Sequence, residues 1–311
     1  MKIKVLFIRS GNKGQHPITQ NQGDSLQAIG CEMYYFNVVG KGWWGYLKNL
    51  PALKRQISIV QPDVLHAHYS LCGFLATLVF FRGPLVVSLM GSDVITSGKF
   101  FKRIIKFFIR HWWDLVIVKS QEMRDLLKGE QVLIFPNGVN PIDFYPMDKK
   151  MARQKLGWPE DVFIPLFPSD PLRTEKNYPL FKSVVELMAG KGFRIEEKHL
   201  FNLSKVEMNL YYNAADVLIL TSQYEGSPNV IKEAMFCQCP FVSVDVGDVA
   251  YWIKKTNGNV MTGGSANELM DGVFQVIKAG HVVENGRAIE ELSAERIALG
   301  LKMAYIGCLE K

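Results

Sequence analysis

Short runs of β-branched and other apolar residues alternate with longer helix-like segments along the whole chain. In the first half, strands are predicted at residues 4–8, 33–39, 64–68, 85–90, 115–119 and 132–135. In the second half, they are predicted at residues 163–167, 193–197, 217–221, 241–244 and 259–261. Strands that alternate with helices form parallel sheets, because each crossover carries the chain back over the sheet. The pattern therefore predicts an α/β fold.

A break in this pattern lies near the middle of the chain, between Pro136 and Asp148. The stretch holds three prolines and a glycine and has neither helical nor strand periodicity. We therefore predict two doubly wound, Rossmann-like domains at residues 1–140 and 141–311, a division that allows the last helix to pack back on the first domain. Ligands of such sheets bind beyond the carboxyl ends of the strands, so the two domains are expected to face each other across a cleft.

The composition of the chain indicates which kinds of binding partner, compartment and membrane association to expect. The chain has 311 residues, a net charge of +6 and a pI of about 8.9, which favours an anionic partner such as a nucleotide, a phosphate, an acidic lipid or nucleic acid. The five cysteines show no CxxC pair and no zinc-like spacing, so a reducing compartment, the cytoplasm, is expected. The longest apolar run, Leu71 to Phe81, is too short to span a membrane.

Two glutamates stand eight positions apart in the stretch YEGSPNVIKEAMFCQCP, which directly follows a predicted strand. Glu225 is expected in the loop after that strand, and Glu233 on a helix that starts at about Pro228 and ends at about Gln238. Ser227 is the predicted N-cap of this helix, and Pro228 suits its first position because proline lacks an N–H group.

This helix start combines an anion site with two acceptor groups. The first-turn N–H groups of Asn229 and Val230, together with the helix dipole, favour an anion. A carboxylate only accepts hydrogen bonds, so Glu225 and Glu233 each suit the vicinal hydroxyls of a sugar or a ribose. The alternatives are a solvated loop acid for Glu225 and a helix-surface charge for Glu233.

The segment EGSPNVIKEAMFCQCPFVSVDVGDV resembles the carboxyl-terminal signature of the retaining glycosyltransferases of family 4, formerly group 1, which have the GT-B fold. PDVLHAHYS, SLMGSDV, IVKS, FPNGVNPIDF and the KN of RTEKN resemble other blocks of this family in the same order. The resemblance implies that Glu225 contacts the transferred sugar and that Glu233 holds the ribose of the nucleotide. It places Gly226, Ser227, Pro228, Asn229 and Val230 around the bound donor.

A diphosphate leaving group requires positive charge, and the loop DPLRTEKN supplies Arg173 and Lys176. The family uses an arginine and a lysine in this loop and usually reads G-R-L before the lysine. Here Asp170-Pro171-Leu172 stands in that place, so Lys176 is the better assignment. The alternative is a pair of ordinary loop cations.

Three further sites follow strand ends of the first domain. Gly11 and Gly14 form a glycine pair that alone is weak evidence for phosphate, although the family's glycine loop lies against the donor phosphates and the acceptor. His68 matches the family's histidine on the acceptor side, whereas His66, deeper in the same strand, is predicted to be packed. Asp93 either orients an acceptor hydroxyl or caps the next turn.

The segment from Lys99 to Trp113 predicts a helix with a stripe of cations and a wide apolar surface. This pattern indicates one of two things: a helix that binds an acidic membrane surface, or a helix that packs on the sheet and exposes its basic face to solvent. Tryptophans and cations between Gly42 and Arg55 add to the first interpretation. Nucleic acid is not expected, because neither segment belongs to a known binding module.

Together these features predict a retaining glycosyltransferase that moves a sugar from a nucleotide diphosphate sugar to a saccharide or lipid-linked acceptor, in polysaccharide or glycolipid synthesis. The sequence has no D-x-D motif and no metal-like cluster, so neither a metal nor another cofactor is expected. We expect a cytoplasmic protein that associates with the inner face of the membrane. Two alternatives remain open: a non-catalytic nucleotide-sugar-binding subunit and a sugar-nucleotide epimerase of the same fold.

Overall fold

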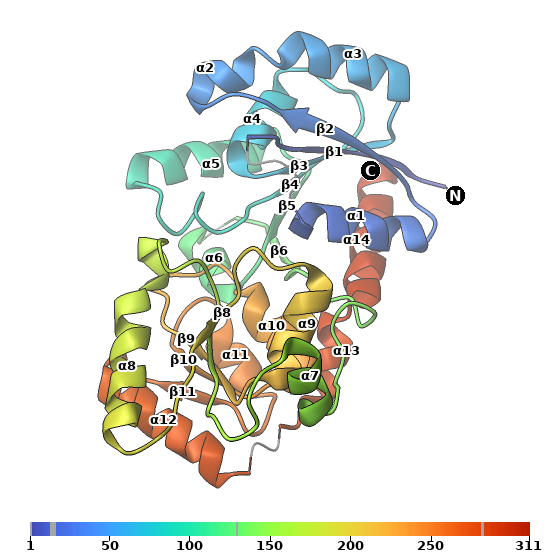
Figure 1. Cartoon of the computed structure of the whole chain (residues 1–311). Helices are drawn as coiled ribbons and strands as arrows, with labels where there is room; N and C mark the ends of the chain where they lie inside the picture. The colour runs from blue at the N-terminus through green and yellow to red at the C-terminus, as the bar shows by residue number, and fades with distance from the viewer. Residues whose placement is uncertain (1, 13–16, 129, 281–282) are drawn as a thin grey trace. The chain divides into compact units, whose positions relative to one another are not determined.

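The computed structural model describes residues 2–12, 17–128, 130–280 and 283–311. The chain forms two compact units (Figure 1). Residues 1–138 and 294–311 form the first unit, and residues 139–293 form the second. The first boundary lies two residues before the predicted one, and the last helix, α14 (Ala294–Leu309), belongs to the first unit.

The first unit holds a parallel sheet with the strand order β2-β1-β3-β4-β5-β6. Its strands are β1 (Lys4–Ser10), β2 (Glu32–Val38), β3 (Val64–His68), β4 (Leu85–Ser88), β5 (Leu115–Val118) and β6 (Leu133–Ile134). Its helices are α1 (Pro17–Ala28), α2 (Gly42–Leu47), α3 (Leu50–Val60), α4 (Ser70–Thr77), α5 (Lys99–His111), α6 (Gln121–Leu126) and α14. The predicted strands of this half are thus found, with their ends shifted by no more than two residues.

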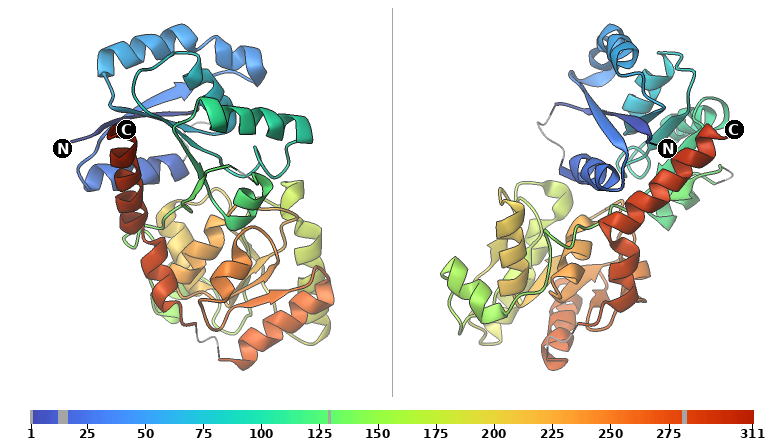
Figure 2. Two further views of the ribbon diagram at one scale, coloured as in Figure 1. Left: turned by 180° about the vertical axis from the view of Figure 1, so that it is seen from behind. Right: turned by 90° about the vertical axis from the view of Figure 1, so that its right-hand side faces the viewer.

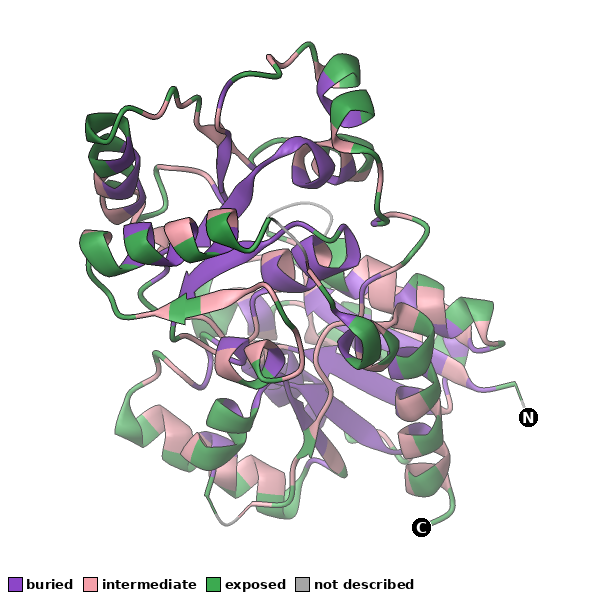
Figure 3. Cartoon of the chain, turned by 90° about the horizontal axis from the view of Figure 1, so that it is seen from below, coloured by how far each residue is buried: buried purple, intermediate pink, exposed green. Residues whose placement is uncertain are grey.

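Helices cover both faces of this sheet. Leu6 and Ile8 belong to the core on one face, whereas Val5 and Phe7 belong to the core on the other. This alternation follows from the two-residue period of a strand. Helix α14 packs beside α1 and places Tyr305 in the second core (Figures 1 and 2). The central strands are accordingly buried, while the helices keep exposed outer faces (Figure 3).

The second unit holds a parallel sheet with the strand order β11-β10-β9-β7-β8. Its strands are β7 (Pro165–Phe167), β8 (Lys198–His199), β9 (Val217–Leu220), β10 (Phe241–Val244) and β11 (Val260–Thr262). Its helices are α7 (Lys149–Leu156), the 3₁₀ turn η1 (Thr174–Lys176), α8 (Tyr178–Gly190), α9 (Lys205–Ala214), α10 (Asn229–Phe236), α11 (Val249–Ile253), α12 (Ala266–Lys278) and α13 (Gly286–Leu292). Two parallel, doubly wound sheets confirm the predicted fold class.

One predicted strand of this unit is misplaced. Residues 193–197 were predicted to form it, but β8 is Lys198–His199. Phe193 and Ile195 alternate as strand residues do, yet they pack into the core, and this segment pairs with Phe163 through an isolated bridge. Partial burial of the two apolar side chains therefore explains the pattern that suggested a longer strand.

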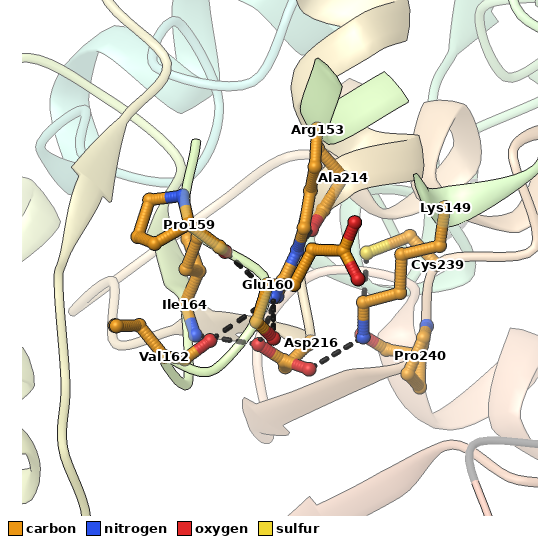
Figure 4. Close-up of polar contacts among 10 residues, drawn as sticks. All are labelled: Lys149, Arg153, Pro159, Glu160, Val162, Ile164, Ala214, Asp216, Cys239 and Pro240. Atoms are coloured by element: carbon orange, nitrogen blue, oxygen red, sulfur yellow. Dashed lines mark hydrogen bonds and ion pairs between the residues drawn. The ribbon is translucent and has the colours of Figure 1, made fainter. Parts of the chain in front are cut away.

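A buried ion network joins α7 to the amino ends of β7 and β9 (Figure 4). Arg153 of α7 is buried and donates to Asp216 Oδ2 at 2.7 Å. Its remaining N–H groups donate to the backbone carbonyls of Pro159, Glu160, Val162 and Ala214. These hydrogen bonds offset the cost of burying the guanidinium group, and the network fixes the edge of the sheet opposite the carboxyl ends.

Candidate functional site

An ion pair joins Lys176 and Glu225 at the carboxyl edge of the second sheet. Lys176 ends η1 in the loop after β7, and Glu225 lies in the loop after β9, which is the neighbouring strand. Both side chains are largely buried, at 12% and 14% exposed. Ser222 Oγ donates to the same carboxylate oxygen, Oε1, at 2.8 Å. Glu225 is therefore not a solvated loop acid, and its Oε2 accepts no hydrogen bond from any described residue.

Backbone contacts hold these two loops together. Thr221 Oγ1 donates to the carbonyl oxygens of Lys176 and Asn177, at 2.9 and 3.1 Å. The N–H group of Gln223 donates to the carbonyl of Glu175 at 2.9 Å. The loops that follow two adjacent parallel strands lie at the same edge of the sheet, and these hydrogen bonds then fix the two loops to each other. The fold thus preforms the position of Lys176 beside Glu225.

Arg173, the other cation predicted for this loop, pairs with a different glutamate. Its guanidinium group pairs with Glu175 at 2.6 Å, and its side chain is 54% exposed. The structure therefore brings Lys176 to Glu225, whereas Arg173 is bound to its sequence neighbour.

Helix α10 begins one residue later than predicted, at Asn229, and ends at Phe236 instead of about Gln238. Pro228 takes the N-cap position, so the prediction of Ser227 as N-cap is wrong. The Ser227 hydroxyl donates to Asp248 Oδ2 at 2.6 Å and accepts from Lys232 Nζ, and these partners draw it away from the helix end. Asn229 and Val230 form the first turn, and Gly226 lies in the loop between Glu225 and the helix.

Glu233 lies on α10, and it is part-buried instead of lying on the solvent face of the helix. The hydroxyl of Tyr212, a buried residue of α9, donates to Glu233 Oε2 at 2.8 Å. Burial raises the pKa of Glu233 to about 6, and the bond from Tyr212 opposes this shift. Glu233 Oε1 accepts from no residue in the described part of the chain, so one oxygen is held and the other remains available to a hydroxyl.

In the first unit, the loop after β1 is attached to the end of β2. The Gly11 N–H group donates to the carbonyl of Val38 at 2.7 Å. A Cβ atom at Gly11 would lie 3.1 Å from Asn37 Cβ and 3.3 Å from the carbonyl oxygen of Val38, so the close approach of the two segments favours glycine here. Gly14, predicted as the second glycine of this loop, lies outside the described residues.

His66 and His68 share one face of β3, as the strand period predicts, and their rings stack with centroids 4.3 Å apart. His66 is fully buried between Tyr305 and Ser88, at 2.6 and 2.8 Å from its ring nitrogens, and is a packed histidine as predicted. Burial lowers the pKa of His66 well below its usual value. His68 is also buried, at the carboxyl end of the strand, with its ring edge against Phe7.

Asp93 caps a turn. Its buried carboxylate accepts from the N–H groups of Ser70, Met90 and Gly91 at 2.9 to 3.1 Å. Burial raises the pKa of Asp93 to about 6, although these bonds oppose the shift. The structure thus shows Asp93 bound to backbone N–H groups, and a role toward an acceptor hydroxyl stays a prediction.

Helix α5 carries both features expected of the Lys99–Trp113 segment. Ile105 is buried in the core of the unit, whereas Phe100, Phe107 and Trp112 are exposed. Lys106 donates to the carbonyl of Lys128. No helix within the described ranges is long and apolar enough to cross a bilayer. Nor do three or more His, Cys, Asp or Glu side chains of the described residues gather where a metal ion could bind.

The fold and the site define a protein of the GT-B class, and two family models match its sequence. Residues 10–142 match the model described as Glycosyltransferase Family 4, and residues 182–279 match the model described as Glycosyl transferases group 1. The chain belongs to the group 1, family 4 glycosyltransferases, as the sequence motifs predict.

A curated relative is the putative teichuronic acid biosynthesis glycosyltransferase TuaC of Bacillus subtilis. It is 25% identical over 235 residues, which are 68% of this chain and 60% of that relative. The chain therefore spans about 60% of the length of the relative that it matches.

Solved GT-B structures share the fold over nearly the whole chain. Sucrose-phosphate synthase from Thermosynechococcus elongatus has a TM-score of 0.78 and 18% identity, with 98% of this chain and 99% of that chain covered. Anabaena HepE in complex with UDP and glucose has a TM-score of 0.75 and 18% identity, with 98% and 100% covered. At these identities the likeness concerns the fold.

Proposed function

We propose that the protein is a retaining, metal-independent glycosyltransferase that moves a sugar from a nucleotide diphosphate sugar to a saccharide or lipid-linked acceptor. The Lys176–Glu225 pair beside the start of α10 is the observation that carries this proposal. It combines a cation and a helix N-terminus for phosphate with a carboxylate for hydroxyls. The family, the UDP complexes of HepE and the description of TuaC support a nucleotide-sugar donor and a role in cell-surface polysaccharide or glycolipid synthesis.

In the proposed reaction, the bond between the anomeric carbon and the β-phosphate oxygen breaks, and the nucleoside diphosphate leaves with the bonding electrons. The acceptor hydroxyl forms its new bond on the same face of the sugar, and its proton passes to the departing phosphate oxygen. Lys176 and the first-turn N–H groups of α10 stabilise the charge that develops on this oxygen. Arg173 is proposed to assist them when it exchanges Glu175 for the diphosphate.

The remaining residues position the substrates. Glu225 holds hydroxyls of the transferred sugar through Oε2, and Glu233 holds the ribose through Oε1. Gly226 to Val230 surround the diphosphate. Gly11 and Gly14 are proposed to lie against the donor phosphates, and His68 to face the acceptor.

A lipid-linked acceptor would require the protein to reach a membrane surface. We propose that α5 provides this contact, through its cations, its exposed Phe100 and Phe107, and the exposed Trp112 at its C-cap. The protein would then act in the cytoplasm on the inner face of the membrane.

Product analysis of the purified chain tests the proposal. The chain is incubated with UDP-, GDP- and ADP-sugars, with and without saccharide or lipid-linked acceptors, and free nucleoside diphosphate is measured. One donor should release nucleoside diphosphate, faster with an acceptor, and the product should keep the anomeric configuration of the donor. Altered donor sugar without an acceptor would indicate an epimerase. Donor binding without release, under every condition, would indicate a non-catalytic subunit.

A further inference from the structure

The second unit contains a lysine with no exposed surface. Lys232 lies in the middle of α10, one residue before Glu233, and is 0% exposed. A buried ammonium group is rare because it loses its hydration, so it must be compensated by partners. Burial lowers the pKa of Lys232, while the charges of Asp248 and Glu233 oppose this shift and favour the ammonium form.

The partners of Lys232 form a chain of contacts across three segments. Lys232 Nζ donates to Ser227 Oγ and lies 3.8 Å from Asp248 Oδ2. Ser227 Oγ donates its own hydrogen to Asp248 Oδ2 at 2.6 Å, and Trp252 Nε1 donates to the same oxygen at 2.8 Å. Helix α10, the loop before it and the segment after β10 are thus joined by side chains.

Asp248 receives its hydrogen bonds and its counter-ion from this arrangement. Its side chain is buried, and its other oxygen, Oδ1, has no hydrogen-bond partner among the described residues. Oδ2 therefore takes the hydrogen bonds from Ser227 and Trp252, and Lys232 is the cation that faces it. Loss of the Lys232 charge would leave a buried carboxylate without a counter-ion, which is strongly destabilising.

The same contacts lie next to the backbone of the loop that carries Glu225. Gly247, the neighbour of Asp248, has a φ of +60°, and a Cβ atom there would lie 3.2 Å from the carbonyl oxygens of Glu225 and Gly226. The chain around Asp248 therefore supports the backbone of Glu225, and Ser227 holds the same loop two residues further on.

We propose that Lys232 is a positioning residue which, through Ser227 and Asp248, fixes the loop between Glu225 and α10 so that Glu225 meets the transferred sugar. This role deepens the proposed function and rests on it. Lys232 itself does not contact the donor. Glu233 accepts its hydrogen bond from Tyr212, which lies outside this network, although the charge of Lys232 also acts on Glu233. The network is therefore expected to act mainly on the step at the sugar.

The test uses two alterations of the network. Ser227→Ala removes the hydroxyl that links the two charges, and the double variant Lys232→Met/Asp248→Asn removes both charges together, which avoids an unpaired buried ion. In both variants, kcat at saturating donor should fall about tenfold to a hundredfold, because small misplacements of a positioning group are costly. In the double variant, which leaves Ser227 at the proposed diphosphate site unchanged, the affinity for the nucleoside diphosphate that binds most tightly among UDP, GDP and ADP should change less than kcat does.

Arg153→Met provides a matched control, since Arg153 is another buried cation of the second unit, at the amino end of β9. It should lower the melting temperature while leaving the nucleotide affinity and kcat of the folded protein unchanged. The role of Lys232 is refuted if both network variants are folded and keep the wild-type kcat, or if nucleotide affinity and kcat fall together in all three variants. A wild-type chain that neither binds nucleotides nor releases them from donors would instead refute the proposed function.

Discussion

The ammonium group of Lys176 contacts the carboxylate of Glu225, although the two residues are 49 positions apart in the chain. Each is held in place by its own loop, and the loops are joined by bonds from Thr221 and Gln223. Without a donor, the two charges compensate each other inside the protein. In the proposed function, a bound diphosphate would share Lys176, and the free oxygen of Glu225 would accept hydrogen bonds from a sugar.

The first prediction concerns this pair. Lys176→Ala and Glu225→Ala should each reduce sugar transfer by about a hundredfold or more. Lys176 is proposed to stabilise the negative charge on the leaving phosphate, and Glu225 to hold hydroxyls of the sugar. Circular dichroism should show an unchanged fold. Arg173→Ala should cost less, since Arg173 is exposed and bound to Glu175. Unchanged turnover in either of the first two variants would contradict the assignment.

The second prediction concerns the pH dependence of donor binding through Glu233, whose pKa is about 6. The carboxylate form of Glu233, which is proposed to accept a hydrogen bond from the ribose, is present above this pKa and is lost as the pH falls through it. Affinity for a nucleotide sugar should therefore decrease about tenfold between pH 7 and pH 5. Calorimetry with Glu233→Gln should show weaker binding without this dependence. An equal dependence in both proteins would assign it to another group.

The third prediction concerns the hydrogen bond from Tyr212 to Glu233. This bond lowers the pKa of Glu233 against the effect of burial. Tyr212→Phe should therefore raise that pKa, so the midpoint of the binding profile moves to higher pH. The loss of one hydrogen bond should also lower the free energy of unfolding by about 1 kcal/mol. A midpoint at the wild-type pH would show that Tyr212 has no influence on the carboxylate.

The fourth prediction concerns α5 and its exposed aromatic residues. The protein should sediment with vesicles that contain acidic phospholipid at low salt, and less so at high salt, because cations on the helix contribute to binding. Replacement of Phe100, Phe107 and Trp112 by serine should weaken sedimentation and leave donor hydrolysis intact. An absence of binding at low salt would remove the membrane contact from the account.

The sheets could be predicted because buried parallel strands are continuous apolar runs, and each run alternates between two cores, as Val5 and Leu6 do. The second-unit site could be predicted in part because Glu225 and Lys176 follow neighbouring strands. The N-cap of α10 could not be predicted: the sequence favoured Ser227, but the hydroxyl of Ser227 is bound to Lys232 and Asp248, which only the fold brings near, and Pro228 takes the N-cap position.

Two important side chains of the site were missed, for different reasons. Lys232 lies on the buried side of α10 with Ile231 and Met235. A cation within the apolar stripe of the helix was the sequence signal that could have predicted its burial. Tyr212 comes from another helix, and no spacing in the sequence connects it with Glu233. Such partners depend on how α9 and α10 pack, which local patterns do not contain.

The central claim is that the second unit binds a nucleoside diphosphate between Lys176, Glu233 and the start of α10. Thermal unfolding with UDP, GDP and ADP tests it most directly, because a ligand that binds the native state raises the melting temperature. One of the three, at about 100 times its dissociation constant, should raise the melting temperature by about 5 °C or more. The shift should be lost in Glu233→Ala and retained in Arg153→Met. No shift with any of the three nucleotides would contradict the account.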